Sequence, residues 1–83
     1  MNAKETIIED MHGSWIDFDA QAVLRVRKLP IEVTAFEAKV RLRIHTKEGV
    51  MIAEPGDFVI KGIAGEYYPC DGNIFKQTYQ QEI

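Results

Sequence analysis

Apolar and polar residues alternate most regularly between residues 36 and 44. The apolar positions are Phe36, Ala38, Val40, Leu42 and Ile44, and Glu37, Lys39, Arg41 and Arg43 lie between them. Successive side chains of a strand point to opposite faces, so this pattern predicts one strand with a buried face and a cationic face. Just upstream, Ile31, Val33 and Ala35 have the opposite parity. We therefore expect a bulge, a bend or a turn near Ala35 and Phe36.

Two hairpins are predicted downstream. Thr46-Lys47-Glu48-Gly49 is typical of a turn, and residues 50–53 would form the returning strand. Pro55-Gly56 predicts a second turn, because proline presets one turn dihedral and glycine supplies the positive φ of a type II turn. Residues 58–60 would then pair with residues 66–68 across a connection with glycine at both ends, residues 62–65.

The N-terminal part of the chain predicts mixed structure. Residues 2–11 suit one short helix, with Asn2 as N-cap and Glu5 in the capping-box position, ended by Gly13. Residues 14–19 alternate and suggest a strand or an extended arm. In that segment we expect Trp15 to be a packing anchor, with an exposed contact residue as the alternative. Residues 22–29 predict a strand that ends at Pro30.

The C-terminal part predicts a turn at residues 71–73, followed by a short helix or helical turn at residues 74–80. The inner side of that helix would carry Ile74, Phe75, Thr78 and Tyr79. The predicted fold is therefore mainly β, of the α+β kind. It is a small antiparallel sheet, barrel or roll of five or six strands, with a short C-terminal helix and a further short helix expected at the N-terminus.

Composition indicates one small globular domain. The chain has 83 residues, of which 46% are hydrophobic and 28% charged, and a domain of this size buries roughly 60–65% of the surface of its unfolded chain. No apolar run approaches the ~18 residues of a membrane helix. No secretory signal is expected, and the single cysteine fits a reducing cytosol.

The formal net charge of −3 is distributed unevenly. Residues 1–24 sum to −4, residues 25–47 to +5 and residues 48–83 to −4. An acidic N-terminal stretch beside a basic centre could dock on the basic face of its own chain.

Candidate catalytic groups are few. Cys70 would be a nucleophile only beside a histidine, and a buried, inert thiol is the favoured interpretation. Asp57 and Glu66 could form an acid–base pair across the hairpin, but we expect Asp57 to bond turn amides and Glu66 to be solvated. His12 and His45 show no metal-ligand spacing with the acids. The glycines do not precede a helix as in a phosphate loop. We expect no enzyme, no metal and no cofactor.

The basic residues are the main candidate binding site. Lys39, Arg41 and Arg43 would project from one face of their strand, and Arg25, Arg27 and Lys28 would extend the patch if the two strands pair. The simplest interpretation is a solvated edge strand whose charges prevent aggregation. The alternatives are binding of nucleic acid, a phosphorylated small molecule or an acidic protein. Because no aromatic residues are interleaved with the cations and the net charge is acidic, a protein partner is favoured.

The C-terminal half resembles a group of short bacteriophage and prophage proteins. The residues that carry the resemblance are Pro55-Gly56-Asp57, Ile60-Lys61-Gly62, Gly65-Glu66, Tyr68-Pro69-Cys70, Phe75 and Thr78-Tyr79, with Arg27-Lys28-Leu29-Pro30 and the turn from Thr46 to Met51 upstream. It covers roughly residues 27–80. The stretch between the opening strand and the Thr46 turn is shorter here, and Ala38 replaces a frequent aromatic residue. The resemblance implies a viral or mobile-element origin and a bacterial host cytoplasm. It carries over no catalytic residues.

These observations predict an N-terminal extension, residues 1–26, joined to a phage-type β domain, residues 27–83. The predicted function is non-enzymatic: an accessory protein that binds a host protein or complex, as a counter-defence or host-takeover factor, away from membranes. One alternative is a binder of nucleotide or nucleic acid through the basic strand. Another is a structural, self-assembling component, and a homodimer is compatible with the sequence.

Overall fold

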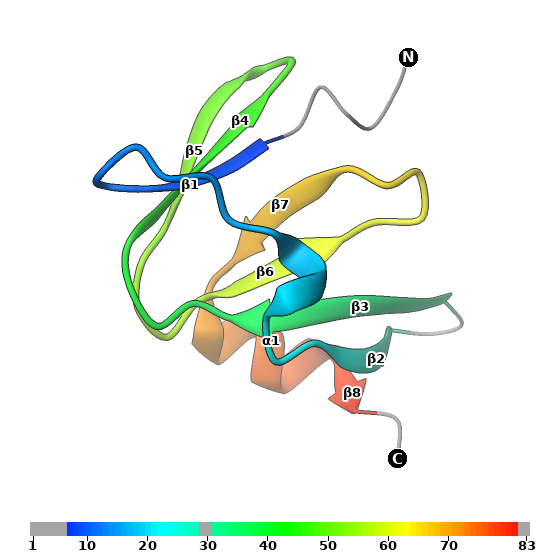
Figure 1. Cartoon of the computed structure of the whole chain (residues 1–83). Coiled ribbons are helices and arrows are strands. Elements are labelled where there is room, and N and C mark those ends of the chain that lie inside the picture. The colour runs from blue at the N-terminus through cyan, green and yellow to red at the C-terminus, as the bar shows by residue number, and fades with distance from the viewer. Residues whose placement is uncertain (1–6, 29–30, 82–83) are drawn as a thin grey trace.

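The computed structural model describes residues 7–28 and 31–81. These residues form two antiparallel sheets and a short C-terminal helix (Figure 1), which confirms the predicted fold class. The smaller sheet has the order β1-β4-β5: Ile7–Asp10, Leu42–Thr46 and Gly49–Ala53. The larger has the order β7-β6-β3-β2-β8: Tyr67–Cys70, Phe58–Lys61, Ile31–Glu37, Leu24–Lys28 and Gln80–Gln81. A 3₁₀ turn, η2 (Phe18–Ala20), and helix α1 (Gly72–Thr78) complete the fold, and the sheets do not close into a barrel.

Two hydrophobic clusters lie on opposite faces of the five-stranded sheet. The first fills the space between the two sheets and contains Ile8, Phe18, Phe36, Ala38, Leu42, Ile44, Ala53 and Val59. The second lies under α1 and contains Val26, Ala35, Phe58, Ile60 and Phe75. The molecule is therefore layered as small sheet, large sheet and helix (Figure 1).

The parity change at Ala35 and Phe36 has a different cause from the predicted irregularity. Ala35 pairs with Ile60 and Phe36 with Val59 in one continuous register, so β3 contains no bulge there. Ala35 is 0% exposed in the second cluster, and Phe36 is 3% exposed in the first. The parity changes because β3 is covered on both faces, and each face meets its own cluster.

The predicted continuous strand at residues 36–44 is wrong. β3 ends at Glu37, and β4 begins at Leu42 in the other sheet. Residues 38–41 cross between the sheets, and Ala38 anchors the crossing: its N–H donates to the Asp57 carbonyl at 2.8 Å, and its carbonyl accepts from Gly56 N–H at 2.9 Å. The alternation persists in the sequence because β3 and β4 line the first cluster from opposite sides.

The predicted N-terminal helix is also wrong over its described part. Residues 7–10 form β1, in which Ile8 pairs with Ile44, whereas residues 2–6 lie outside the described residues. Ten residues make a marginal helix in isolation, and pairing with β4 buries Ile8 instead. After a turn at Gly13, with φ of 86°, the expected strand over residues 14–19 is limited to a bridge at Trp15, and the chain then enters η2.

Both hairpins follow the prediction. Thr46 pairs with Gly49 and Lys61 with Tyr67, and the Pro55-Gly56 turn has Gly56 at φ 95°. At the C-terminus, Asp71 is the N-cap of α1 rather than part of a separate turn, because its side chain accepts from the backbone of Asn73 and Ile74. Phe75 and Tyr79 pack inward as expected, but Ile74 and Thr78 are exposed.

Residues 7–26, the described part of the predicted extension, contribute to both sheets and both clusters. β1 belongs to the small sheet, β2 to the large one, and Phe18 packs in the first cluster against Phe36 at 5.3 Å between ring centroids. No helix in the described ranges has the length and apolar character needed to cross a membrane.

The layered core predicts unequal costs for two isoleucine substitutions. Ile44 is 0% exposed and Ile74 is 55% exposed. Ile44→Ala leaves a cavity between the sheets and should lower the free energy of unfolding by about 2–5 kcal/mol. Ile74→Ala, the matched control, should cost less than about 1 kcal/mol. Urea denaturation followed by circular dichroism measures both, and equal losses would contradict this packing.

Candidate functional site

The six cations named from the sequence do not form one patch. Arg25, Arg27 and Lys28 lie on β2, which pairs with β3 and β8 and not with the strand that follows residue 38. Lys39 and Arg41 lie in the crossing between the sheets, and only Arg43 lies on β4. The six cations are therefore distributed over the large sheet, the small sheet and the connection between them.

At least four of these cations are paired with carboxylates. The pairs are Arg25 with Glu32 at 3.6 Å, Lys39 with Glu37 at 3.4 Å, Arg41 with Glu54 at 3.3 Å, and Arg43 with Glu9 at 3.9 Å. The Lys28 ammonium lies 5.7 Å from the Tyr79 ring centroid. Such exposed pairs add little stability, but each places a negative charge beside a cation that nucleic acid would need.

The acidic N-terminal stretch does contact the basic strand of its own chain. Glu9 on β1 lies opposite Arg43 on β4. Its Oε1 is 2.6 Å from His45 Nε2, and the Arg43 guanidinium also donates to the Asp10 carbonyl at 3.3 Å. This contact is part of the pairing between β1 and β4, so the charges on these two strands serve partly to hold the small sheet together.

The small sheet has one face turned away from the core, which we call the outer face. Directly paired residues share a face of a sheet, so the register assigns its members. They are Ile7, His45 and Val50 in one row and Trp15, Glu9, Arg43 and Ile52 in the next. Ile8, Leu42 and Ile44 occupy the opposite, buried face.

Trp15 is the most exposed member of the outer face. Its side chain is 74% exposed, so the expected packing anchor is wrong and the alternative, an exposed residue, is observed. Its neighbour Ile16 packs against the first cluster instead, because adjacent residues in extended backbone point to opposite sides.

The backbone around Trp15 is nevertheless held in place. Ile16 N–H donates to the Ile8 carbonyl, and Asp10 N–H donates to the Ser14 carbonyl, both at 2.9 Å. The Asp10 carboxylate also accepts from the N–H groups of His12 and Ser14. Trp15 is therefore exposed to solvent on a loop whose backbone is fixed by hydrogen bonds.

Polar groups separate the apolar parts of the outer face. Glu9, Arg43 and His45 lie in the middle, where the Glu9 carboxylate interacts with both Arg43 and His45. Trp15 lies on the β1 side of them, and Val50 and Ile52 lie on the β5 side. The result is an amphipathic surface whose central charges already have partners within the chain.

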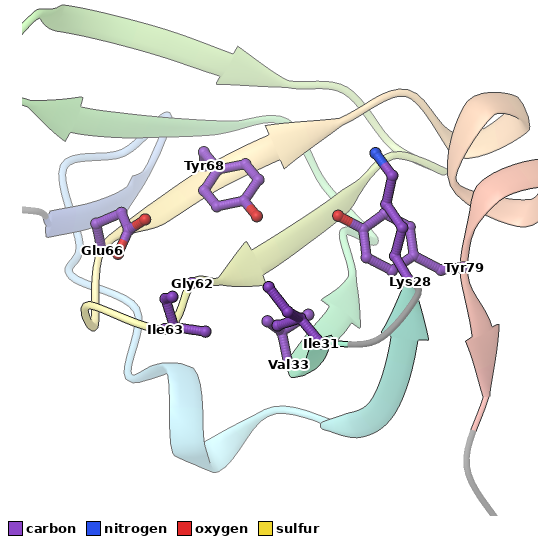
Figure 2. A pocket seen from close by; sticks show the side chains of 8 residues that line it. All are labelled: Lys28, Ile31, Val33, Gly62, Ile63, Glu66, Tyr68 and Tyr79. Carbon is purple, nitrogen blue, oxygen red and sulfur yellow. The ribbon is translucent and has the colours of Figure 1, made fainter.

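A pocket lies on the α1 side of the large sheet, away from the small sheet (Figure 2). Its volume is about 190 Å³. It is lined by Lys28, Ile31, Val33, Gly62, Ile63, Glu66, Tyr68 and Tyr79. The pocket exists because α1 is seven residues long and ends near Tyr79, so the sheet face that carries the second cluster continues past the helix. Tyr79 closes the covered part by stacking on Phe75, with 4.8 Å between the ring centroids.

Two side chains on this side of the large sheet have raised pKa values. Burial, followed by a hydrogen bond with Tyr79, raises the pKa of Tyr68 to about 12. Burial also raises the pKa of the Cys70 thiol, which disfavours the reactive thiolate. Cys70 packs on the second cluster, whereas His45 lies on the outer face of the other sheet, so they do not form a nucleophile–base pair.

The carboxylates behave as the simpler interpretation predicts. Asp57 lies at the start of the β6–β7 hairpin, and Glu66 lies at its connecting turn, so the two do not face each other. Asp57 accepts from the N–H groups of Glu54 at 2.9 Å and Gly72 at 3.2 Å. Glu66 is exposed. Within residues 7–28 and 31–81, no group of three or more histidine, cysteine or acidic side chains could hold a metal ion.

No protein-family model, no curated protein and no solved structure matches this chain. Function must therefore be inferred from its own surfaces. Sequence reasoning missed the exposed side chains of Val50 and Ile52, because an uninterrupted apolar run such as Val50-Met51-Ile52 is normally taken as buried.

The pocket predicts a late tyrosine titration. The folded-state pKa of Tyr68 lies above its usual value of about 10, because the fold favours the protonated hydroxyl. The contribution of this hydroxyl to the free energy of unfolding is complete below pH ~10 and is lost as the pH rises towards 12. Absorbance at 295 nm should show one tyrosine ionising near pH 12 in the folded protein. Tyr68→Phe should remove that step, whereas Tyr67→Phe, the control, should retain it. A late step that survives Tyr68→Phe would contradict the assignment.

Proposed function

We propose that this protein acts by binding another protein through the outer face of its small sheet. The exposed Trp15 is the observation that carries the proposal. Tryptophan is the residue type most enriched among binding hot spots, because one side chain removes a large rigid area from water. On this loop Ile16 packs against the first cluster, whereas Trp15 faces solvent. The hydrogen bonds of the loop hold Trp15 in a position suited to contact with a partner.

The rest of the outer face supports the same role. Val50 and Ile52 add apolar area on the far side of the central charges. Because Glu9 already pairs with Arg43 and His45, a partner that covers these residues would not leave an isolated charge without a counter-ion. Apolar anchors around satisfied polar groups are characteristic of protein interfaces.

Nucleic acid fits this surface less well. At least four of the six candidate cations have carboxylate partners, and the six are divided between two sheets and the connection that joins them. A phosphate backbone would have to displace those carboxylates, one by one, before it gained its own contacts. The proposed partner is accordingly a protein. The bacteriophage resemblance of residues 27–80 supports a host protein and a role as an accessory or counter-defence factor.

Affinity capture from bacterial lysate tests the proposal. The immobilised protein should retain one stoichiometric protein that survives nuclease treatment and can be identified and purified. In a titration with that purified partner, Trp15→Ala should weaken binding about 30-fold, the equivalent of ~2 kcal/mol at a hot spot. Trp15→Ala should change the free energy of unfolding by no more than about 0.5 kcal/mol, because the side chain is exposed.

The matched control is Ile63→Ala. Ile63 is as exposed as Trp15 but lies on the β6–β7 turn, in a different part of the molecule, so its removal should leave the affinity unchanged. Affinity for the purified partner that is unaffected by Trp15→Ala would overturn the proposed binding face. Capture that disappears with nuclease and with the Arg41→Glu, Arg43→Glu double variant would overturn the proposal in favour of nucleic acid.

A further inference from the structure

Over residues 7–28 and 31–81, the two sheets have four edge strands: β1, β5, β7 and β8. An edge strand presents unpaired backbone N–H and C=O groups, and proteins commonly protect such edges with proline, charge, a bulge, a very short strand or a covering loop. How each of these four edges is treated therefore indicates which of them is available for pairing.

Three of the edges are protected. The loop that carries Trp15 returns along β1, where Ile16 N–H donates to the Ile8 carbonyl. β7 is four residues long and contains Pro69, which has no donor. β8 is only two residues long, Gln80–Gln81.

β5 has none of these features. Its sequence, Gly-Val-Met-Ile-Ala, contains no charge and no proline, and its register with β4 is unbroken over five pairs. Val50, Met51 and Ile52 are 55%, 43% and 36% exposed, and they lie on both faces of the strand. No segment other than β4 pairs with β5 in the described parts of the chain. The inner side of the β4–β5 hairpin lies next to β7, where Thr46 and Met51 share a hollow with Tyr67, but β7 does not pair with β5.

We propose that β5 pairs antiparallel with β5 of a second copy of this chain. The result is a two-fold dimer whose small sheets join as β1-β4-β5-β5-β4-β1. An isologous contact of this kind needs a self-complementary segment, and β5 meets that condition because it is apolar throughout.

The charges that flank β5 do not oppose this pairing. One end carries the Lys47-Glu48 turn, which has no net charge. The other end carries Glu54, which is already paired with Arg41. Antiparallel pairing places the turn end of one copy beside the Glu54 end of the other, so no net like charges face each other.

A two-fold axis perpendicular to the joined sheet keeps both outer faces on the same side. The dimer would therefore present two Trp15 side chains, one at each end of a single continuous surface. This inference concerns the edge of the small sheet and does not require a foreign partner, so it can hold or fail independently of the proposed function.

Sedimentation equilibrium from micromolar to near-millimolar protein tests the dimer. The unmodified protein should pass from monomer to dimer with concentration. The Val50→Lys, Ile52→Lys double variant places like charges along the joined edges and should raise the dissociation constant at least about tenfold. Ile63→Lys adds a charge at an exposed site elsewhere and should leave the dissociation constant unchanged.

Hydrogen exchange on the unmodified protein provides a test that needs no variant. Amide exchange at residues 50–52 should slow as the concentration rises through the dissociation constant, whereas exchange of the exposed residues near Ile63 should not change. A monomer at every concentration, a dimer indifferent to the β5 charges, or protection of β5 only when another protein is added would each overturn the assignment to a second copy.

Discussion

Burial of both faces of β3 is the constraint on which the rest of this small fold depends. At Ala35 and Phe36 consecutive side chains enter different hydrophobic clusters, one under α1 and one between the sheets. A single strand thereby joins three layers in a chain of 83 residues. In so small a domain the surface-to-volume ratio is high and few side chains are buried, so each buried side chain matters. It also explains why the chain must leave the large sheet after Glu37. The small sheet that covers Phe36 has to be built from residues on either side of β3, namely β1 before it and β4 and β5 after it.

The exposed apolar surface follows from this layering. The small sheet is the outermost layer on its side, so nothing in the described chain covers its outer face, and its last strand has a free edge. On the opposite side, α1 is too short to cover the whole of the large sheet, and the pocket beside Tyr68 and Tyr79 lies where the helix ends. Trp15, Val50 and Ile52 are exposed because they lie on the outer face of the outermost layer. The outer face and the β5 edge are adjacent, so binding of a partner and pairing of two copies can use one sheet.

Electrostatics in this protein is mainly local. The sequence divides into acidic, basic and acidic thirds, yet the fold distributes the basic third over β2, β4 and the crossing between the sheets. Several of its cations then lie beside carboxylates, and two of them, Arg25 and Arg43, lie beside a carboxylate of the neighbouring strand, Glu32 and Glu9 respectively. A charge block in a sequence becomes a charged surface only if its residues share a face, and here the change of sheet after residue 37 prevents it. The same change of sheet is invisible in the alternating pattern, because strands on both sides of one core repeat the same parity.

The sequence by itself determined the local elements whose cause is local. The two hairpins, the Pro55-Gly56 turn, the role of Asp57 in that turn and the C-terminal helix all follow from residues close together in the chain, whose conformational preferences act without tertiary help. Only the tertiary structure decided which strands share a sheet, that residues 7–10 extend rather than coil, and that Trp15 faces solvent while Ile16 faces the core. These outcomes depend on pairings such as Ile8 with Ile44, between residues far apart in sequence, and their free energy exceeds the weak local preference of a short segment. The candidate binding surface belongs to this second group, because a side chain is exposed or buried according to which layer covers it.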